Sequence, residues 1–191
     1  MKILVIEASN YLKMPWANGS GITREVDIWP PGSSLANRDF LWRVSSASVI
    51  GKGSFSEFSG FDRLLTVISP NNLIVNSHSL SLGQVLQFPG EQEMTYLAQS
   101  EVTDFGIIYD RNRCVAKMTF FDFQQSMSSL FNLTVGTHYF YLITGCLKLK
   151  SHQITKGSTM RIQVDRTDQE VHADIVTDEN TKFIFASLST K

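Results

Sequence analysis

Short runs of Val, Ile, Thr, Phe and Tyr recur along the chain, and clusters of Gly, Pro, Asn, Ser and Asp separate them. This pattern is typical of β-strands joined by turns. Alternation of apolar and polar residues is clearest in segments 160–166 and 171–177. The residues expected to share one strand face are Met160, Ile162 and Val164 in the first segment, and Val171, Ala173, Ile175 and Thr177 in the second.

The same pattern predicts an all-β fold with little helix. Strands are expected near 2–6, 23–29, 40–49, 63–68, 73–77, 83–88, 93–98, 103–109, 115–121, 138–143, 145–150, 159–164, 171–177 and 182–188. The best helix candidate is 124–133, although its helical periodicity is weak. This number of strands is too large for one small barrel, and we therefore expect two stacked barrels or sandwiches. No Pro/Gly/Ser linker separates them, which favours one compact 1–191 unit with packed lobes near 1–100 and 101–191.

Composition narrows the classes of partner. The 17 basic and 18 acidic residues nearly balance, so nothing in the charge favours nucleic acid or an anionic membrane. The first apolar run is too short for a signal peptide, and no stretch is long enough to cross a membrane. Cys114 and Cys146 form neither a disulfide framework nor a metal pair. We expect a cytoplasmic protein with two reduced thiols.

Several common chemistries lack their motifs. The four histidines, at 78, 138, 152 and 172, are too far apart to form a recognisable metal pair, and HxH, HExxH, CxxC and GxSxG are missing. The loop Asn18-Gly19-Ser20-Gly21 leads into a strand, whereas phosphate-binding loops lead into a helix. We interpret it as a turn that places residues 23–25 at the mouth of the first lobe.

The segment 39–49 carries polar residues where a core strand would be apolar. In a strand, Arg43 shares a face with Ser45 and Ala47, which leaves space beside a guanidinium. A carboxylate pocket needs such donors and such room. Alternatively, Arg43 faces solvent or pairs with an acid such as Glu25 or Asp62.

The next segment, 51–67, combines glycine turns with aromatic residues. Phe55, Phe58 and Phe61 precede Asp62-Arg63, which opens an apolar strand. An arginine beside aromatic residues is consistent with a lined cavity. The alternative is an Asp–Arg contact that stiffens a hairpin.

These segments together resemble the HutD/Ves family. The resemblance is carried by PWANGSGITRE at 15–25, DFLWRVS at 39–45 with Ala47 and Val49, and GSFS at 53–56 with Phe58, Gly60, Asp62 and Arg63. Further similarity lies in Phe88-Pro89-Gly90, Asp104-Phe105 and residues 114–117, although Gly106 stands where the family has Asn and Ile108 where it has Met.

The resemblance implies a double cupin, with two RmlC-like jelly-roll barrels in one chain. It also implies no metal and no cofactor, since the histidine-rich motifs of catalytic cupins are missing. In the HutD branch it implies a regulatory role in histidine utilisation, through a metabolite such as N-formylglutamate or urocanate. In the Ves branch it implies a role in cold or stress response.

We therefore expect a non-catalytic protein that binds a small carboxylate and has no nucleic-acid or membrane partner. A homodimer is compatible with the sequence. The candidate ligand-binding residues are Asn18, Arg24, Glu25, Trp42, Arg43, Ser45, Phe55 and Arg63, with Trp16 as a further wall. One alternative is a protein-interaction module. Another is a metal-free enzyme, for which His78, Glu25 and Tyr96 are the candidate general bases.

Overall fold

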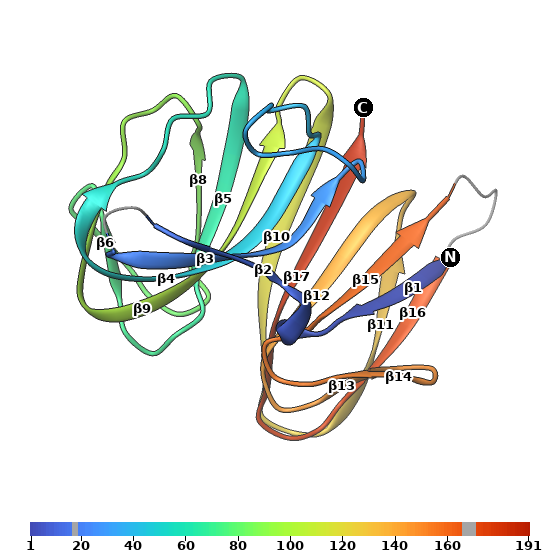
Figure 1. Cartoon of the computed structure of the whole chain (residues 1–191). Helices are drawn as coiled ribbons and strands as arrows, with labels where there is room; N and C mark the ends of the chain where they lie inside the picture. The colour runs from blue at the N-terminus through green and yellow to red at the C-terminus, as the bar shows by residue number, and fades with distance from the viewer. Residues whose placement is uncertain (17–18, 166–170) are drawn as a thin grey trace. The chain divides into compact units, whose positions relative to one another are not determined.

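The computed structural model describes residues 1–16, 19–165 and 171–191, and strands dominate it (Figure 1). Within these ranges the helical structure is limited to a single 3-10 turn, η1 (Ala8–Asn10). The prediction of an all-β protein is therefore confirmed. The chain divides into two units, an N-terminal unit of residues 11–115 with Lys191, and a C-terminal unit of residues 1–10 and 116–190.

The N-terminal unit is built on one antiparallel sheet with the strand order β2-β3-β4-β9-β5-β8. Two short strands extend it, since β6 pairs with both β7 and β9. The strands are β2 (Leu12–Pro15), β3 (Gly21–Trp29), β4 (Trp42–Ser54), β5 (Phe61–Val67), β6 (Leu73–Val75), β7 (His78–Leu80), β8 (Val85–Pro89) and β9 (Thr95–Asp110).

The C-terminal unit has two antiparallel sheets, with the orders β1-β15-β12-β17-β10 and β11-β16-β13-β14. The chain's first strand therefore belongs to this unit, next to β15. The strands are β1 (Lys2–Ile6), β10 (Cys114–Phe123), β11 (Met127–Leu133), β12 (Gly136–Thr144), β13 (Leu147–Leu149), β14 (His152–Ile154), β15 (Thr159–Val164), β16 (Val171–Thr177) and β17 (Thr181–Thr190).

Three features differ from the sequence predictions. The helix candidate 124–133 is wrong, because β11 forms there with Ser129, Phe131 and Leu133 alternating toward the interior. Two expected strands, near 93–98 and 103–109, are one long strand, β9. The short strands β2, β7 and β14 were not expected, and the units divide at 115/116, later than the lobes expected near residue 100.

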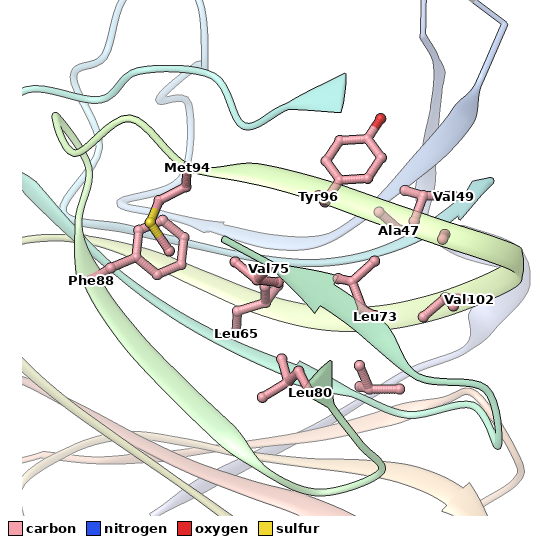
Figure 2. Packing of buried hydrophobic residues seen from close by; sticks show 12 residues of the cluster. Ala47, Val49, Leu65, Leu73, Val75, Leu80, Phe88, Met94, Tyr96 and Val102 are labelled. Atoms are coloured by element: carbon pink, nitrogen blue, oxygen red, sulfur yellow. The ribbon is translucent and has the colours of Figure 1, made fainter. Parts of the chain in front are cut away.

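Each unit has its own buried core. In the N-terminal unit, apolar side chains from β4, β5, β6, β8 and β9 point toward one another (Figure 2). In the C-terminal unit, the alternation predicted from sequence is confirmed. The buried residues there include Met160, Ile162, Val164, Ala173 and Ile175.

None of the described ranges contains a helix with the length and apolar character needed to cross a membrane. Both cysteines are free: Cys114 is buried and Cys146 is half-buried. Burial raises the pKa of the Cys114 thiol to about 11, so this thiol stays protonated at neutral pH.

Candidate functional site

The N-terminal unit contains a cavity of about 520 Å³, adjoined by a smaller compartment of about 100 Å³. The two share five lining residues: Trp16, Thr23, Arg43, Phe55 and Arg63. The larger compartment is also lined by Met14, Pro15, Leu35, Gly53, Ser54, Ser56, Phe58 and Tyr96, and the smaller one by Ser45, Ala47, Leu64, Leu65, Phe88, Asp104, Ile107 and Ile108. A volume of this size suits a small organic molecule.

Strand register explains why both arginines line this space. On β9, Ile108 lies opposite Arg43 of β4 on one side and Arg63 of β5 on the other. Directly paired residues of an antiparallel sheet project to the same face. The two guanidiniums therefore enter the cavity from the same level of the sheet.

The same register brings small residues and one acid to the cavity floor. Two residues back along β9, Gly106 lies opposite Ser45, and two further back Asp104 lies opposite Ala47. Neither Gly106 nor Ala47 carries a long side chain, so the floor beside the arginines stays open. A Cβ at Gly106 would meet only ordinary contacts, at 3.6 Å from the Leu64 carbonyl oxygen.

Arg43 is buried, with 6% of its side chain exposed, and its Nε donates to Glu25 Oε2 at 2.6 Å. Glu25 lies on β3 and is itself largely buried, so the two charges neutralise each other away from water. The Nη2 nitrogen of Arg43 is buried and has no hydrogen-bond partner among the described residues. A buried donor without a partner costs free energy, and a ligand oxygen in the cavity would satisfy it.

Arg63 is surrounded by aromatic rings. Its guanidinium carbon lies 5.1 Å from the ring centre of Phe58, 5.5 Å from Phe55 and 5.8 Å from Phe88. Within the described residues it forms no hydrogen bond or ion pair, so its direct contacts are these cation–π interactions. Burial and, to a smaller extent, the nearby Arg43 lower its pKa to about 10, against an opposing attraction from Asp104. It remains a cation at neutral pH.

Asp104 is 6% exposed and lines the smaller compartment. Its Oδ1 accepts a hydrogen bond of 3.3 Å from the Ala47 backbone N–H, which is its one such bond in the described part of the chain. Burial raises the pKa of Asp104 to about 7, although this hydrogen bond and the charge of Arg63 both act in the opposite direction.

The rim of the cavity is held by two close contacts. Trp16 donates from Nε1 to Thr23 Oγ1 at 2.8 Å, which fixes the indole against β3. Opposite Tyr96, a Cβ at Gly53 would lie 2.6 Å from the phenol oxygen, so glycine is needed for this ring to pack there. Aromatic side chains therefore line the rim of the cavity that Arg43 and Arg63 also line.

The structure brings together part of the predicted site. Arg43, Ser45, Phe55 and Arg63 line the cavity, and Glu25 pairs with Arg43 behind them. The proposed alternative of an Arg43–Glu25 ion pair is thus present together with the cavity. Asp62 does not pair with Arg63, because it lies on the other strand face and forms an ion pair of 3.0 Å with Arg111.

Two predicted residues lie elsewhere. Arg24 donates to Ser48 Oγ at 2.9 Å and is not among the lining residues, because it alternates with Thr23 and Glu25 along β3. Trp42 stacks on Trp29 with ring centres 5.8 Å apart, on the strand face opposite Arg43. Asn18 lies outside the described residues. On either side of it, the Gly19 N–H donates to the Trp16 carbonyl at 3.0 Å, and Gly19 has a φ of 69°.

Sequence reasoning did not select Asp104, Phe88 or Thr23 for the site. A signal for Asp104 exists in VTDFGII at 102–108, because an acid interrupts a strand that is apolar on both faces. Of the candidate general bases, Tyr96 lines the cavity, whereas His78 is exposed and contacts the Asn76 carbonyl. Within the described ranges, no three His, Cys, Asp or Glu side chains gather as a metal site would require.

The family model HutD matches residues 8–181, which is most of the chain. The chain belongs to the HutD family. Protein Ves of Citrobacter koseri is 36% identical over 116 residues, which cover 56% of this chain and 59% of that protein. The chain thus spans about three fifths of the length of the Ves relatives it matches.

Solved structures show the fold of this HutD family member. HutD from Pseudomonas fluorescens SBW25 aligns over 100% of both chains with a TM-score of 0.81 and 23% identity. A cupin 2 conserved barrel domain protein from Leptotrichia buccalis aligns over 100% of this chain and 98% of that chain, with a TM-score of 0.56 and 12% identity. The expected cupin-type β-barrel fold is therefore confirmed.

Proposed function

We propose that the cavity of the N-terminal unit binds a small carboxylic acid, and that the protein acts as a sensor of that acid without converting it. The observation that carries this proposal is the buried Nη2 of Arg43, which faces no partner beside an open cavity. A carboxylate oxygen is the complementary acceptor for such a donor.

The surroundings of Arg43 support an anionic ligand with an apolar body. Arg63 contributes a second cation that no acid neutralises directly, while Phe55 and Trp16 provide flat apolar walls. Each charge-assisted hydrogen bond contributes roughly 1.5–3 kcal/mol. One or two such bonds with apolar contacts would give micromolar binding, about −8 kcal/mol, which suits sensing of a metabolite.

Family membership supports a regulatory role as the context for this binding. By likeness to the HutD branch we propose a part in histidine utilisation, with a ligand of the N-formylglutamate or urocanate class. By likeness to Ves, the alternative is a part in cold or stress response. A shift in ligand occupancy, not turnover, is the output that both roles share.

The proposal is tested by the thermal stabilisation that small acids confer on purified protein. We expect the stabilisation to be lost in Arg43→Ala and in Arg63→Met. Arg63→Met is the cleaner variant, because it breaks no hydrogen bond or ion pair of the described residues, whereas Arg43→Ala removes the bonded partner of Glu25. Arg24→Met is the matched control, since Arg24 lies on the opposite strand face, and it should respond like the native protein. Equal stabilisation in all three variants would overturn the proposal.

Acid–base catalysis on the bound acid is the second candidate function, and Asp104 is the observation that favours it. A buried carboxyl whose pKa is about 7 can both accept and donate a proton near neutral pH. Conversion of a bound acid, lost in Asp104→Asn while binding persists, would promote this candidate above the sensor.

A further inference from the structure

Of the described residues that line the two compartments, Asp104 is the only acid. One of its oxygens accepts the Ala47 N–H, and no other donor of the described chain reaches it. A carboxylate normally accepts several hydrogen bonds when it is buried. The environment of Asp104 therefore provides little to hold a negative charge except the cation of Arg63.

The charges that face Asp104 come from three neighbouring strands. Arg43 of β4 is already neutralised by Glu25 of β3, which leaves Arg63 of β5 as the remaining cation. On β9 itself Tyr96 lies at the rim, whereas Glu101, Tyr109 and Asp110 line neither compartment, and β6 and β8 carry no titratable group. Without a ligand, an ionised Asp104 and Arg63 balance each other.

An anionic ligand disturbs this balance. If a carboxylate lies against Arg63 while Asp104 is ionised, two negative charges share one cation in a space that excludes most water. Like charges at close range in such a site favour protonation of one of them. A ligand carboxylate held by both arginines would have more donors than Asp104, which accepts one weak hydrogen bond, so the proton would go to Asp104.

We infer that the cavity binds a monocarboxylate together with one proton, which is taken up by Asp104, so that the filled cavity carries no net charge. The inference rests on the proposed function. It makes Asp104 the residue that selects a ligand with a single negative charge, so of the two proposed ligand classes it favours urocanate, a monocarboxylate, over N-formylglutamate, a dicarboxylate. It also makes occupancy depend on pH as well as on ligand concentration. Since the pKa of Asp104 in the empty protein is about 7, the dependence lies within the physiological range.

The test is calorimetric titration of the full-length protein with valerate at pH 6, 7 and 8. Valerate is fully ionised over this range, and no histidine among the described residues lines the cavity. We expect the affinity to fall about tenfold between pH 6 and pH 8, with uptake of about half a proton at pH 7, measured from the heats in two buffers. Binding of valerate with no pH dependence and no proton uptake would overturn the inference.

Asp104→Asn imitates the protonated state, because the amide keeps an oxygen for the Ala47 N–H and carries no charge. We expect this variant to bind valerate equally at pH 6 and pH 8, and more tightly than the native protein at pH 8. Asp174→Asn removes an exposed carboxyl from β16 and should keep the native pH dependence. If the pH dependence persists in Asp104→Asn, another group takes the proton and the inference is wrong.

Two further probes test the class of ligand. Glutarate adds a second carboxylate at the same chain length, and valeramide removes the charge. We expect both to bind at least about tenfold more weakly than valerate, because glutarate brings a surplus negative charge into the cavity, whereas valeramide offers the arginines no charged acceptor. Tighter binding of glutarate would contradict the preference for one charge. If neither acid binds, the proposed function itself fails, and this result differs from pH-independent binding of valerate.

Discussion

The interiors of the two units are filled in different ways. In the C-terminal unit, rings fill the space between the sheets. Phe183 is fully buried and stacks on Phe121 at 5.0 Å, with Phe140 at 6.0 Å and Phe131 at 6.1 Å from its centre. In the N-terminal unit, the corresponding interior holds two arginines, an acid and an open volume of about 520 Å³.

The difference shows which stabilising interactions a fold loses when its interior contains a binding cavity. Rings packed on rings bury apolar area and leave few voids, which stabilises the structure directly. The N-terminal unit gives up part of that stabilisation and adds the desolvation of Arg43, Glu25, Arg63 and Asp104. Such groups persist in a core when they serve recognition, so the contrast between the units is itself support for a binding role.

The largest expected effect comes from opening the filled interior. Phe183→Ala should destabilise the protein by about 4 kcal/mol, because it leaves a cavity where four other phenylalanines had packed. Denaturation in urea, followed by far-UV circular dichroism, measures this loss. Phe183→Leu is the control and should lose about 1.5 kcal/mol. A loss below about 1 kcal/mol in the alanine variant would mean that this interior is not close-packed.

The next effect comes from breaking the buried ion pair of the N-terminal unit. Glu25→Gln should cost about 3 kcal/mol, because Arg43 keeps its charge without a partner. All three tryptophans, Trp16, Trp29 and Trp42, lie in this unit, so their fluorescence follows its unfolding.

A double variant distinguishes the stability contribution of the ion pair from the contributions of its two residues. In Glu25→Leu/Arg43→Met both charges are absent, so we expect most of the loss to be recovered, together with complete loss of ligand binding. If the two single losses simply add in the double variant, the ion pair does not hold the charges as the geometry indicates.

A third effect is a dependence of stability on pH, which we expect from the N-terminal unit. The pKa of Asp104 is about 7 in the folded protein and about 4 when unfolded, so between these values only the folded state holds the proton. Stability must then fall as pH rises, by about 2.5 kcal/mol between pH 5 and pH 8. Tryptophan fluorescence in urea at each pH measures this fall. Asp104→Asn should remove it, whereas an unchanged slope in that variant would place the titration elsewhere.

The fold was largely predictable from sequence because its signals are local. Runs of strand-forming residues, with alternation in the last two, predicted β1, β15 and β16 with their observed bounds, and the resemblance supplied the cupin architecture. Segment 124–133 was misjudged because its serines hide a period of two that only Phe131 and Leu133 mark clearly. Short strands such as β7 and β14, with three residues each, lack enough positions to show alternation.

From the sequence, only those features of the site could be predicted that depend on which face of a strand a residue occupies. Alternation along β4 correctly grouped Arg43 with Ser45 and separated both from Trp42, although Trp42 was still included among the candidate contacts. The meeting of Arg43 with Arg63, and of both with Asp104, depends on the register of β9 between β4 and β5. Register is a tertiary property, set by turn geometry and packing, so a single sequence does not specify it.

The smallest effect is expected from a substitution in the cavity wall of the N-terminal unit. Phe55 is half-buried and already borders open space, so Phe55→Ala enlarges an existing volume where Phe183→Ala would create one. We expect a loss of about 1 kcal/mol, most of it from one of the three rings that contact Arg63. Tryptophan fluorescence in urea measures it, with Phe55→Leu as the control for volume. A loss as large as that of Phe183→Ala would show that Phe55 stabilises a packed core. The ratio of the two losses therefore reports directly whether the N-terminal interior is built around a vacant binding volume.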